Sequence, residues 1–250
     1  MPSAISFQGL RGLPEVGVGA DLAVLIRKAL IECDLVLQSK DLLVVAQKIV
    51  SKAEGRLVRL DQVTPSAEAR ALAITVQKDP RFVELVLRES KEIVRAVPNI
   101  LITRHRCGWV MANAGIDRSN IPEAEDQVLL LPEDCDASAR RLREALAPEH
   151  PAVIISDSFG RPWREGTVNV ALGVAGYTGV VDLRGTTDRH GRTLQSTQIA
   201  LADAVAAGAG LVMGESTEGI PVTLVRGLDF SLPLSDGQSL VRPSEGDLFR

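Results

Sequence analysis

The chain has 250 residues, of which 45% are hydrophobic, 24% are charged and 3% are aromatic, and its net charge is −4. That composition is typical of a chain that buries its core as one large domain or two small ones, and its scattered basic residues and few aromatic ones argue against nucleic-acid binding. No stretch reaches the roughly 18 apolar residues of a membrane span, and three cysteines without metal-site spacing, Cys33, Cys107 and Cys135, argue against a disulfide framework, so we expect a cytoplasmic protein.

Alternating helical and strand patterns predict an α/β fold with mixed sheets (α+β mixed). In the first half, Leu22, Leu25, Ile26, Ala29 and Leu30 share one helical face. Residues 41–46 and 151–156 are continuous apolar runs, which indicates central strands covered on both sides. Residues 64–68 look like a helix entry capped by Ser66, and the Asp79-Pro80 pair is the start signal of another helix.

The second half follows the loop at residues 122–126. We expect one domain over residues 1–250, with two subdomains that could divide near residues 122–137. The patterns predict a helix at 138–147, a strand at 152–155, glycine-rich strands and turns at 166–191, a helix at 194–207, and strands at 211–213 and 222–225 on either side of Glu215. The tail after Gly227 is expected to be a loop or a helix end.

Three oxygen-rich turns each follow an apolar run that we interpret as a strand. They contain Asn113, Asp117 and Asn120; Ser156, Asp157 and Ser158; and Glu215 with Glu218. Carboxylate, hydroxyl and amide oxygens hold hard divalent cations and, through them, a polyphosphate. We therefore expect a metal-dependent, nucleotide-using enzyme with Asp117, Asp157 and Glu215 as catalytic carboxylates and metal ligands, and Ser158 as a neutral metal ligand.

Each of these residues also has a purely structural interpretation. Asp117 could shape an Asx-turn, Asp157 could cap a helix, Glu215 could be a solvated loop residue, and Asn120, a candidate for contacting a base edge or phosphate, could be a turn residue. The functional interpretation depends on all of them meeting in the folded chain.

Five sequence blocks occur in an order that resembles the coenzyme F420:L-glutamate ligase (F420-0:gamma-glutamyl ligase) family. They are residues 13–16, 47–55, 113–120, 157–161 and 213–221, and the match runs from about Gly9 to Gly227. The resemblance implies a GTP-dependent ligase that adds L-glutamate to the lactyl-phosphate side chain of F420-0, with further gamma-linked glutamates conceivable, through an acyl phosphate.

The same resemblance implies the cofactors, the partners and the fold. GTP would be a co-substrate, two Mg²⁺ or Mn²⁺ ions would bind, and K⁺ is a further candidate. The fold would be neither a Rossmann nor a P-loop fold, in a free-standing, intertwined homodimer that takes small-molecule substrates and no nucleic acid or membrane.

The resemblance also implies roles for the residues at the positions that match the family's motifs. Asp117 and Asp157 would share one metal ion, and Ser158 and Glu215 the other. The expected nucleotide-binding residues are Leu13, Pro14, Glu15, Val16, Gln47, Lys48, Lys52, Asn120, Met213, Gly214, Glu215, Ser216, Thr217, Glu218, Gly219 and Ile220. A lysine ammonium near a γ-phosphate would stabilise developing charge, although Lys48 could equally be a solvated surface residue.

Other nucleotide and metal motifs are missing from the sequence. It has no G-x-x-x-x-G-K-[ST], no G-x-G-x-x-G that opens a helix and no H-E-x-x-H, which argues against a P-loop NTPase, a Rossmann dehydrogenase and a zincin. The alternatives left open are a metal-dependent phosphate or amide hydrolase and a non-catalytic GTP-sensing module.

A few further residues receive an expectation of their own. Arg161 and Arg164 could contact the phosphodiester or carboxylates of the acceptor. The remaining candidates are expected to be structural or exposed histidines, His105, His150 and His190, and core or interface aromatics, Trp109 and Trp163.

Overall fold

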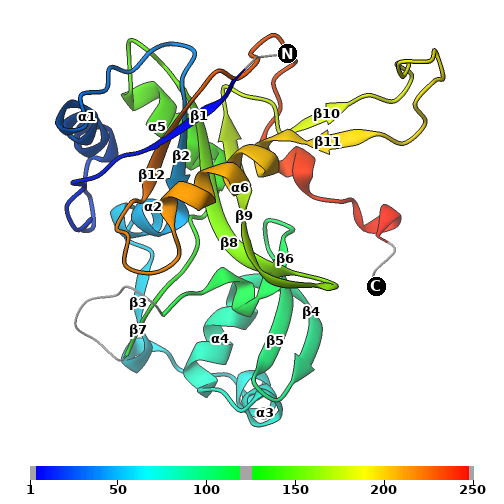
Figure 1. Cartoon of the computed structure of the whole chain (residues 1–250). Helices are drawn as coiled ribbons and strands as arrows, with labels where there is room; N and C mark the ends of the chain where they lie inside the picture. Colours follow the sequence, from blue (N-terminus) through cyan, green and yellow to red (C-terminus); the bar gives the residue numbers. More distant parts are fainter. Residues whose placement is uncertain (1–3, 119–125, 248–250) are drawn as a thin grey trace.

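A computed structural model describes residues 4–118 and 126–247. Its largest sheet has five strands in the order β1-β12-β2-β8-β9 (Figure 1). These strands are β1 Ser6–Gly9, β2 Leu42–Ala46, β8 Ala152–Arg161, β9 Arg164–Ala175 and β12 Val222–Arg226. The β2–β8 pair is parallel and the other pairs in this sheet are antiparallel. The mixed sheets confirm the expected mixed α/β fold class.

The parallel pair at the centre of this sheet is buried on both faces. In β2 the residues Leu42, Leu43, Val44 and Val45 have no exposed surface. Leu43 and Val45 pack with helices α1 (Leu22–Glu32) and α5 (Cys135–Ala145). Leu42 and Val44 pack with helix α6 (Leu201–Met213), which crosses the opposite face in Figure 1. This double cover explains why both strands are continuous apolar runs in the sequence.

A second apolar core lies in the chain between β2 and β8. It is separate from the clusters around the large sheet and includes Leu60, Phe82, Val86 and Leu101. The elements of this region are α2 Gln47–Ala53, β3 Leu57–Arg59, a 3-10 helix Leu60–Gln62, α3 Ala67–Val76, α4 Pro80–Arg88, β4 Ser90–Val97, β5 Ile100–His105, β6 Val110–Ala112, a 3-10 turn Asn113–Gly115 and β7 Gln127–Leu129. The predicted division into subdomains near residues 122–137 stays a prediction.

Local capping signals start both helices of this second core. The Ser66 side chain accepts a hydrogen bond from the Ala69 N–H at 3.1 Å, and Asp79 accepts one from the Arg81 N–H at 2.8 Å, with Pro80 in the first turn. The Ser66 cap and the Asp79-Pro80 start are therefore confirmed. Such signals can be found in sequence because the side-chain oxygen satisfies a backbone N–H only two or three residues away.

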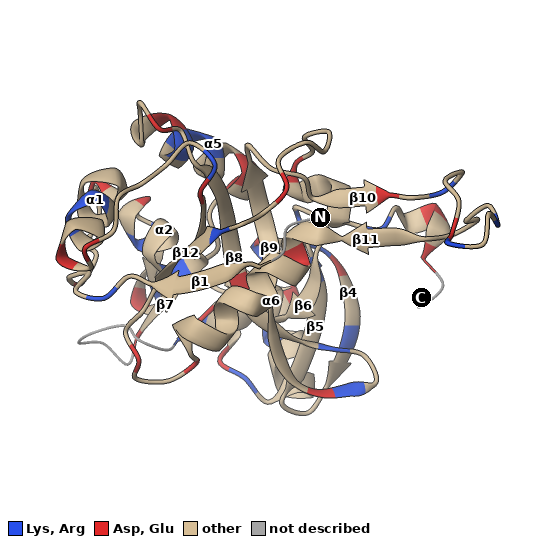
Figure 2. Cartoon of the chain, turned by 45° about the horizontal axis from the view of Figure 1, so that its top comes forward, with Lys and Arg blue, Asp and Glu red and all other residues tan. Residues whose placement is uncertain are grey.

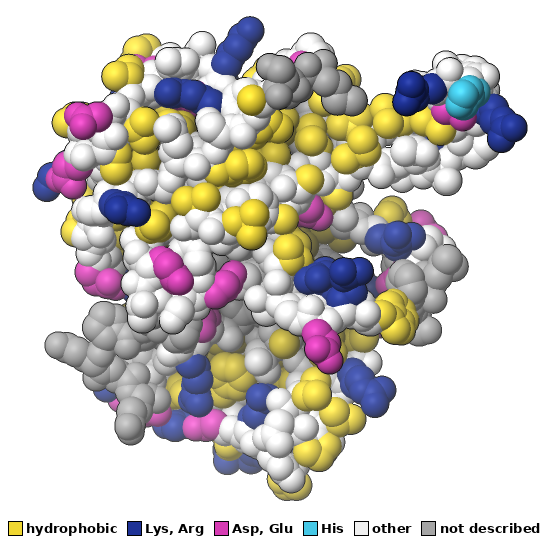
Figure 3. All heavy atoms as spheres, viewed as in Figure 1, with side chains coloured by type: hydrophobic (Ala, Val, Ile, Leu, Met, Phe, Trp, Pro, Cys, Tyr) yellow, Lys and Arg dark blue, Asp and Glu magenta, His cyan; other side chains and the backbone are white. Residues whose placement is uncertain are grey.

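Two long hairpins leave the central sheet. The β8–β9 hairpin continues past the sheet towards the second core, and the arm formed by β10 (Val180–Asp182) and β11 (Gln198–Ala200) projects from the body. Figure 3 shows that charged side chains gather at the end of this arm. The C-terminal segment then contains the 3-10 helices Gly237–Leu240 and Ser244–Gly246.

One predicted element is wrong in its first part and another is wrong in full. Residues 194–200 are not helical, because 198–200 form β11 and pair with β10, and α6 begins only at Leu201. Residues 211–213 are not a strand but the last turn of α6. A short apolar run does not distinguish a strand from a buried helix end, and pairing with a distant strand overrides local periodicity.

Smaller differences concern element ends. Helix α5 begins at Cys135, three residues before the predicted start, because the Asp134 side chain caps it through the Ala137 N–H at 2.9 Å. Figure 2 shows basic residues distributed over many elements and often next to acidic ones. In the described part of the chain, no helix is both long and apolar enough to cross a membrane.

Candidate functional site

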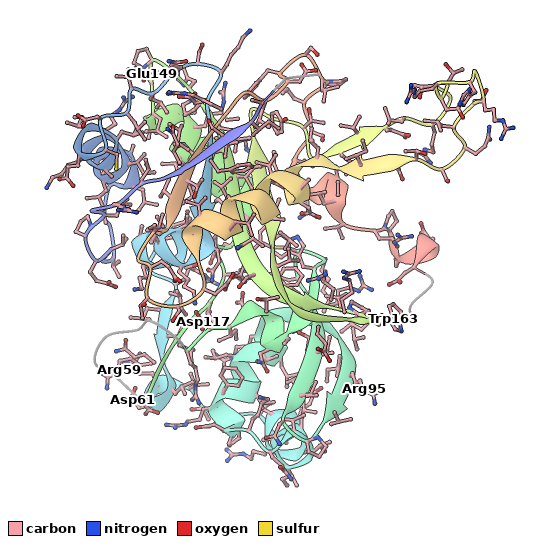
Figure 4. All side chains as sticks on the ribbon, in the orientation of Figure 1. Arg59, Asp61, Arg95, Asp117, Glu149 and Trp163 are labelled. Carbon is pink, nitrogen blue, oxygen red and sulfur yellow. The ribbon has the colours of Figure 1, made fainter. Side chains whose placement is uncertain are left out.

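A cleft of about 720 Å³ opens where the large sheet meets the second core. Its lining comes from five stretches of chain: residues 13–16, 46–52, 111–117, the β8–β9 hairpin and residues 213–221. Figure 4 shows Asp117 at this junction. The predicted site residues that line the cleft are Leu13, Pro14, Glu15, Val16, Gln47, Lys48, Lys52, Asp117, Asp157, Ser158, Met213, Gly214, Glu215, Ser216, Thr217, Glu218, Gly219 and Ile220. Asn120 lies outside the described residues.

Helix α2 brings two lysines into the cleft directly after the buried strand β2. Lys48 and Lys52 are four residues apart and so share one face of the helix. Lys48 forms an ion pair with Asp117, and Lys52 forms one with Glu15. Both lysine side chains are largely shielded, with 32% and 14% of their surface exposed. They are positioned where an anionic ligand would meet two cations.

A tight turn after β6 directs Asp117 into the cleft. Asn113, Ala114 and Gly115 all have left-handed backbones, with φ of 52°, 53° and 70°. A Cβ on Gly115 would lie 2.7 Å from the Leu131 side chain, so glycine suits this position by space as well as by conformation. The Asp117 backbone then exchanges two hydrogen bonds with the Leu129 backbone, at 2.9 and 3.0 Å. These bonds fix the backbone from which the Asp117 side chain projects.

The other two acidic positions do not lie where a strand ends, contrary to expectation. Asp157 and Ser158 lie within β8, which continues to Arg161, and Glu215 follows helix α6 rather than a strand. They meet because α6 packs across the sheet and ends beside the hairpin. The Ser158 hydroxyl donates a hydrogen bond to Glu215 Oε2 at 2.8 Å.

The negative charges in this cleft act on one another. Burial raises the pKa of the Asp157 carboxyl to about 6; the Ser158 N–H and the Lys48 charge oppose this, and the neighbouring Asp117 and Glu215 charges reinforce it. An ionised Asp157 is therefore destabilised unless positive charge enters the cleft. The local electrostatics favour a ligand that carries cations.

The donor chemistry around Asp157 fits Mg²⁺ or Mn²⁺. These ions prefer carboxylate and hydroxyl oxygens, which Asp117, Asp157, Ser158 and Glu215 provide. Among the residues that the structure describes, no three His, Cys, Asp or Glu side chains already surround one point as a metal cluster. The carboxylates thus face one cleft without forming a closed set of ligands.

The loop after α6 also has internal structure. Gly214 has φ of 71°, and a Cβ there would lie 2.2 Å from the Glu218 carboxyl carbon. The Glu218 carboxylate accepts a hydrogen bond from the Ser216 N–H at 2.8 Å. Glu218 therefore shapes this loop, while the backbone of residues 213–220 forms one wall of the cleft.

The cleft also contains polar and apolar residues that belong to none of the predicted site positions. Asn169 lines it, is 9% exposed and donates a hydrogen bond from Nδ2 to Glu215 Oε1 at 3.3 Å. Met111, Phe159 and Thr167 also line it. No local sequence signal identifies them, because their place in the cleft depends on the strand register.

The remaining candidates lie elsewhere. Arg161 and Arg164 flank the tip of the β8–β9 hairpin, outside the described residues that line the cleft, and Trp163 between them is 79% exposed (Figure 4). Trp163 is therefore not a core residue, whereas Trp109 is buried. His105 is buried, His150 is half-buried and His190 is exposed. Contact of Arg161 and Arg164 with an acceptor stays a prediction.

Comparisons with known proteins agree on one family. The family model described as F420-0:Gamma-glutamyl ligase matches residues 11–227. The chain is 46% identical to the coenzyme F420:L-glutamate ligase of Methanothermobacter thermautotrophicus, over 98% of this chain and 99% of that protein. It is 44% identical to the protein of the same name from Natronomonas pharaonis, over 96% of this chain and 92% of the relative.

Proposed function

Because the chain belongs to the F420-0:gamma-glutamyl ligase family, we propose that it is a GTP-dependent ligase that joins L-glutamate to the lactyl-phosphate carboxylate of coenzyme F420-0. GDP and phosphate are the other products, and further gamma-linked glutamates can follow. The observation that carries this proposal is the cleft, which gathers described residues from all five blocks shared with the family.

The reaction needs an activated carboxylate. A carboxylate oxygen of the acceptor attacks the γ-phosphorus of GTP, the bond to the β-phosphate oxygen breaks, and an acyl phosphate forms with GDP as the leaving group. The uncharged amine of glutamate then attacks the acyl carbon, loses a proton and displaces phosphate. Catalysis of phosphoryl transfer rests mainly on alignment and on positive charge around the phosphates.

The charged side chains of the cleft suit that task. Lys48 and Lys52 offer ammonium groups to the phosphates, and each already contacts a carboxylate in the cleft. Asp117 with Asp157, and Ser158 with Glu215, would hold two Mg²⁺ or Mn²⁺ ions, which would neutralise negative charge on the triphosphate. Binding of that assembly would exchange the Lys48–Asp117 ion pair for contacts with the ligand.

The acceptor would occupy the part of the cleft that the nucleotide segments do not line. Met111, Phe159 and Thr167 line it and belong to none of the segments assigned to the nucleotide. Phe159 directly follows Asp157 and Ser158 on β8, so an acceptor carboxylate bound there would approach the γ-phosphate beside the metal ligands.

Mass spectrometry tests the proposal directly. Purified protein with F420-0, glutamate, GTP and Mn²⁺ should give a product heavier by one glutamyl unit, together with GDP. Asp157→Ala and Glu215→Ala should each abolish product, because each removes a carboxylate from the cleft. The surface variant Glu245→Ala, whose side chain is exposed, serves as the control and should keep wild-type activity.

Other outcomes of the same assay separate the alternatives. GTP or acceptor hydrolysis without glutamate would identify a hydrolase, and GTP binding without any modified acceptor would identify a sensing module. Undiminished glutamylation by both alanine variants would refute the assigned role of these carboxylates.

A further inference from the structure

Asn169 is a buried polar residue in the cleft wall that the segments assigned to nucleotide and metal do not include. It lies on β9 directly opposite Ser158 on β8 in the ladder of the hairpin. Residues directly opposite each other in an antiparallel pair project from the same face of the sheet. Asn169 and Ser158 therefore present their side chains side by side.

Both side chains donate to the same carboxylate. The Ser158 hydroxyl donates to Glu215 Oε2 at 2.8 Å, and Asn169 Nδ2 donates to Glu215 Oε1 at 3.3 Å. The opposite orientation of the Asn169 amide would place Oδ1 against the carboxylate, and two acceptors would repel. Each oxygen of Glu215 is thus held by one donor from the hairpin.

A glycine in helix α6 makes room for this contact. A Cβ at position 210 would lie 2.2 Å from Asn169 Nδ2 and 3.1 Å from its Cγ. Glycine is otherwise unfavourable inside a helix, and its φ at position 210 is not in the left-handed region, so space rather than conformation explains it. The same helix ends at Gly214, one turn later, and releases Glu215 into the cleft.

We propose that Asn169 is a positioning residue that orients the Glu215 carboxylate for a bound divalent cation, and that Gly210 keeps the space that Asn169 needs. The proposal rests on the proposed function, in which Glu215 is a metal ligand. With each oxygen fixed from the side of the sheet, the remaining lone pairs of Glu215 stay directed at the cleft, and less reordering is needed when a cation binds. Partners of metal-ligating carboxylates commonly contribute about 10- to 100-fold in metal affinity or activity.

Two variants test the proposal from opposite sides of the contact. Asn169→Ala removes the donor, and Gly210→Ala displaces it from the neighbouring helix. The affinity of the protein for Mn²⁺ in the presence of GTP is measured by calorimetry, and the thermal unfolding temperature is measured in parallel. We expect both variants to bind Mn²⁺ about 10- to 100-fold more weakly than the wild type, with a higher Mn²⁺ requirement in the glutamylation assay.

Gly210→Ala separates positioning from general stability. Alanine favours a helix more than glycine does, but its Cβ must displace Asn169 or α6, so the change in stability alone does not separate the two roles. A merely structural role predicts unchanged Mn²⁺ affinity. Positioning predicts weaker Mn²⁺ binding in a protein that still folds cooperatively. Leu211→Ala is the matched control, because this neighbour on α6 is 90% exposed, and its Mn²⁺ affinity should equal that of the wild type.

Each result decides the question. Mn²⁺ affinities within twofold of the wild type in both Asn169→Ala and Gly210→Ala would overturn the proposal. If the wild type itself binds no Mn²⁺, Glu215 is not a metal ligand and that part of the proposed function fails. Crystal structures of the wild type and Asn169→Ala then test whether Asn169 orients the Glu215 carboxylate. A Glu215 carboxylate that leaves Ser158 in the variant supports positioning by Asn169, and an unmoved carboxylate overturns it.

Discussion

At the scale of single residues, the cleft contains ion pairs whose lysines both lie on helix α2. Lys52 on α2 is 14% exposed and pairs with Glu15, which is 66% exposed and belongs to another segment that lines the cleft. An exposed acid can turn to solvent when a stronger anion arrives, so this ion pair can be exchanged for a contact with a phosphate. Lys52 is therefore a direct test of the nucleotide assignment.

Replacement of Lys52 by methionine should weaken GTP binding about 10- to 100-fold, since a hydrogen bond to a charged group contributes about 1.5–3 kcal/mol and 1.4 kcal/mol is tenfold in affinity. Isothermal titration calorimetry with GTP and Mn²⁺ measures this change. Lys40→Met is the control, because Lys40 is exposed in the loop before β2. Equal GTP affinity in Lys52→Met and the wild type would remove Lys52 from the nucleotide site.

At the scale of elements, the β8–β9 hairpin joins the core to the cleft. The first half of β8 is buried in the large sheet, and its second half carries Asp157 and Ser158. Opposite it, Gly173 on β9 lies against the start of α5, where a Cβ would be 2.2 Å from the carbonyl oxygen of Cys135. At Gly173, strand β9 therefore packs against α5 so closely that no side chain fits between them.

Gly173→Ala should destabilise the protein by about 1–3 kcal/mol, the usual range for added volume in a packed core. Urea unfolding followed by circular dichroism measures this difference. Gly160→Ala on the same hairpin should change stability little, because a Cβ there meets no atom within 4 Å. Unfolding of the two variants at the same urea concentration would show that Gly173 is not held by close packing against α5.

At the scale of the whole molecule, a buried charge network links the second core to the segment that leads into α5. Glu89 at the end of α4 contacts Arg56 at 3.0 Å, Arg106 at 3.1 Å and His105 at 3.5 Å. Burial alone would raise the pKa of Glu89, but the neighbouring His105 ring and the charges of Arg56 and Arg106 outweigh it and lower the pKa to about 2. Arg56 also donates to the Leu131 carbonyl at 2.8 Å.

Glu89 should therefore make stability depend on acid pH. Its pKa falls from 4.5 in an unperturbed chain to about 2 when folded, so it stabilises the folded protein fully above pH 4.5 and loses this contribution as the pH falls towards 2. The lowering corresponds to roughly 3 kcal/mol. Urea unfolding at pH 7 and pH 3 should show a large gap between the wild type and Glu89→Gln at pH 7 and a smaller one at pH 3. A gap that does not depend on pH would contradict this assignment.

The homodimer implied by the family resemblance is a proposal at the same scale. Light scattering coupled to size-exclusion chromatography should give the mass of two chains. A mass of one chain at micromolar concentration would refute it.

The sequence by itself determined the features that depend on neighbouring residues or on burial. Strands β2 and the start of β8 were predictable because cover on both faces demands a continuous apolar run, and the Ser66 and Asp79 caps were predictable because capping acts within three residues. The oxygen-rich segments around Asp117, Asp157 and Glu215 could be selected for the chemistry of their side chains.

Only the tertiary structure decided which of these segments meet and how. Residues 198–200 became a strand because β10 pairs with them, and residues 211–213 became a helix end because α6 packs on the sheet as far as Met213. The register that sets Asn169 beside Ser158, and the approach of α6 that brings Glu215 to both, are likewise non-local. Pairing energies between distant segments outweigh local preferences of a few tenths of a kcal/mol per residue, so the cleft is a property of the folded chain.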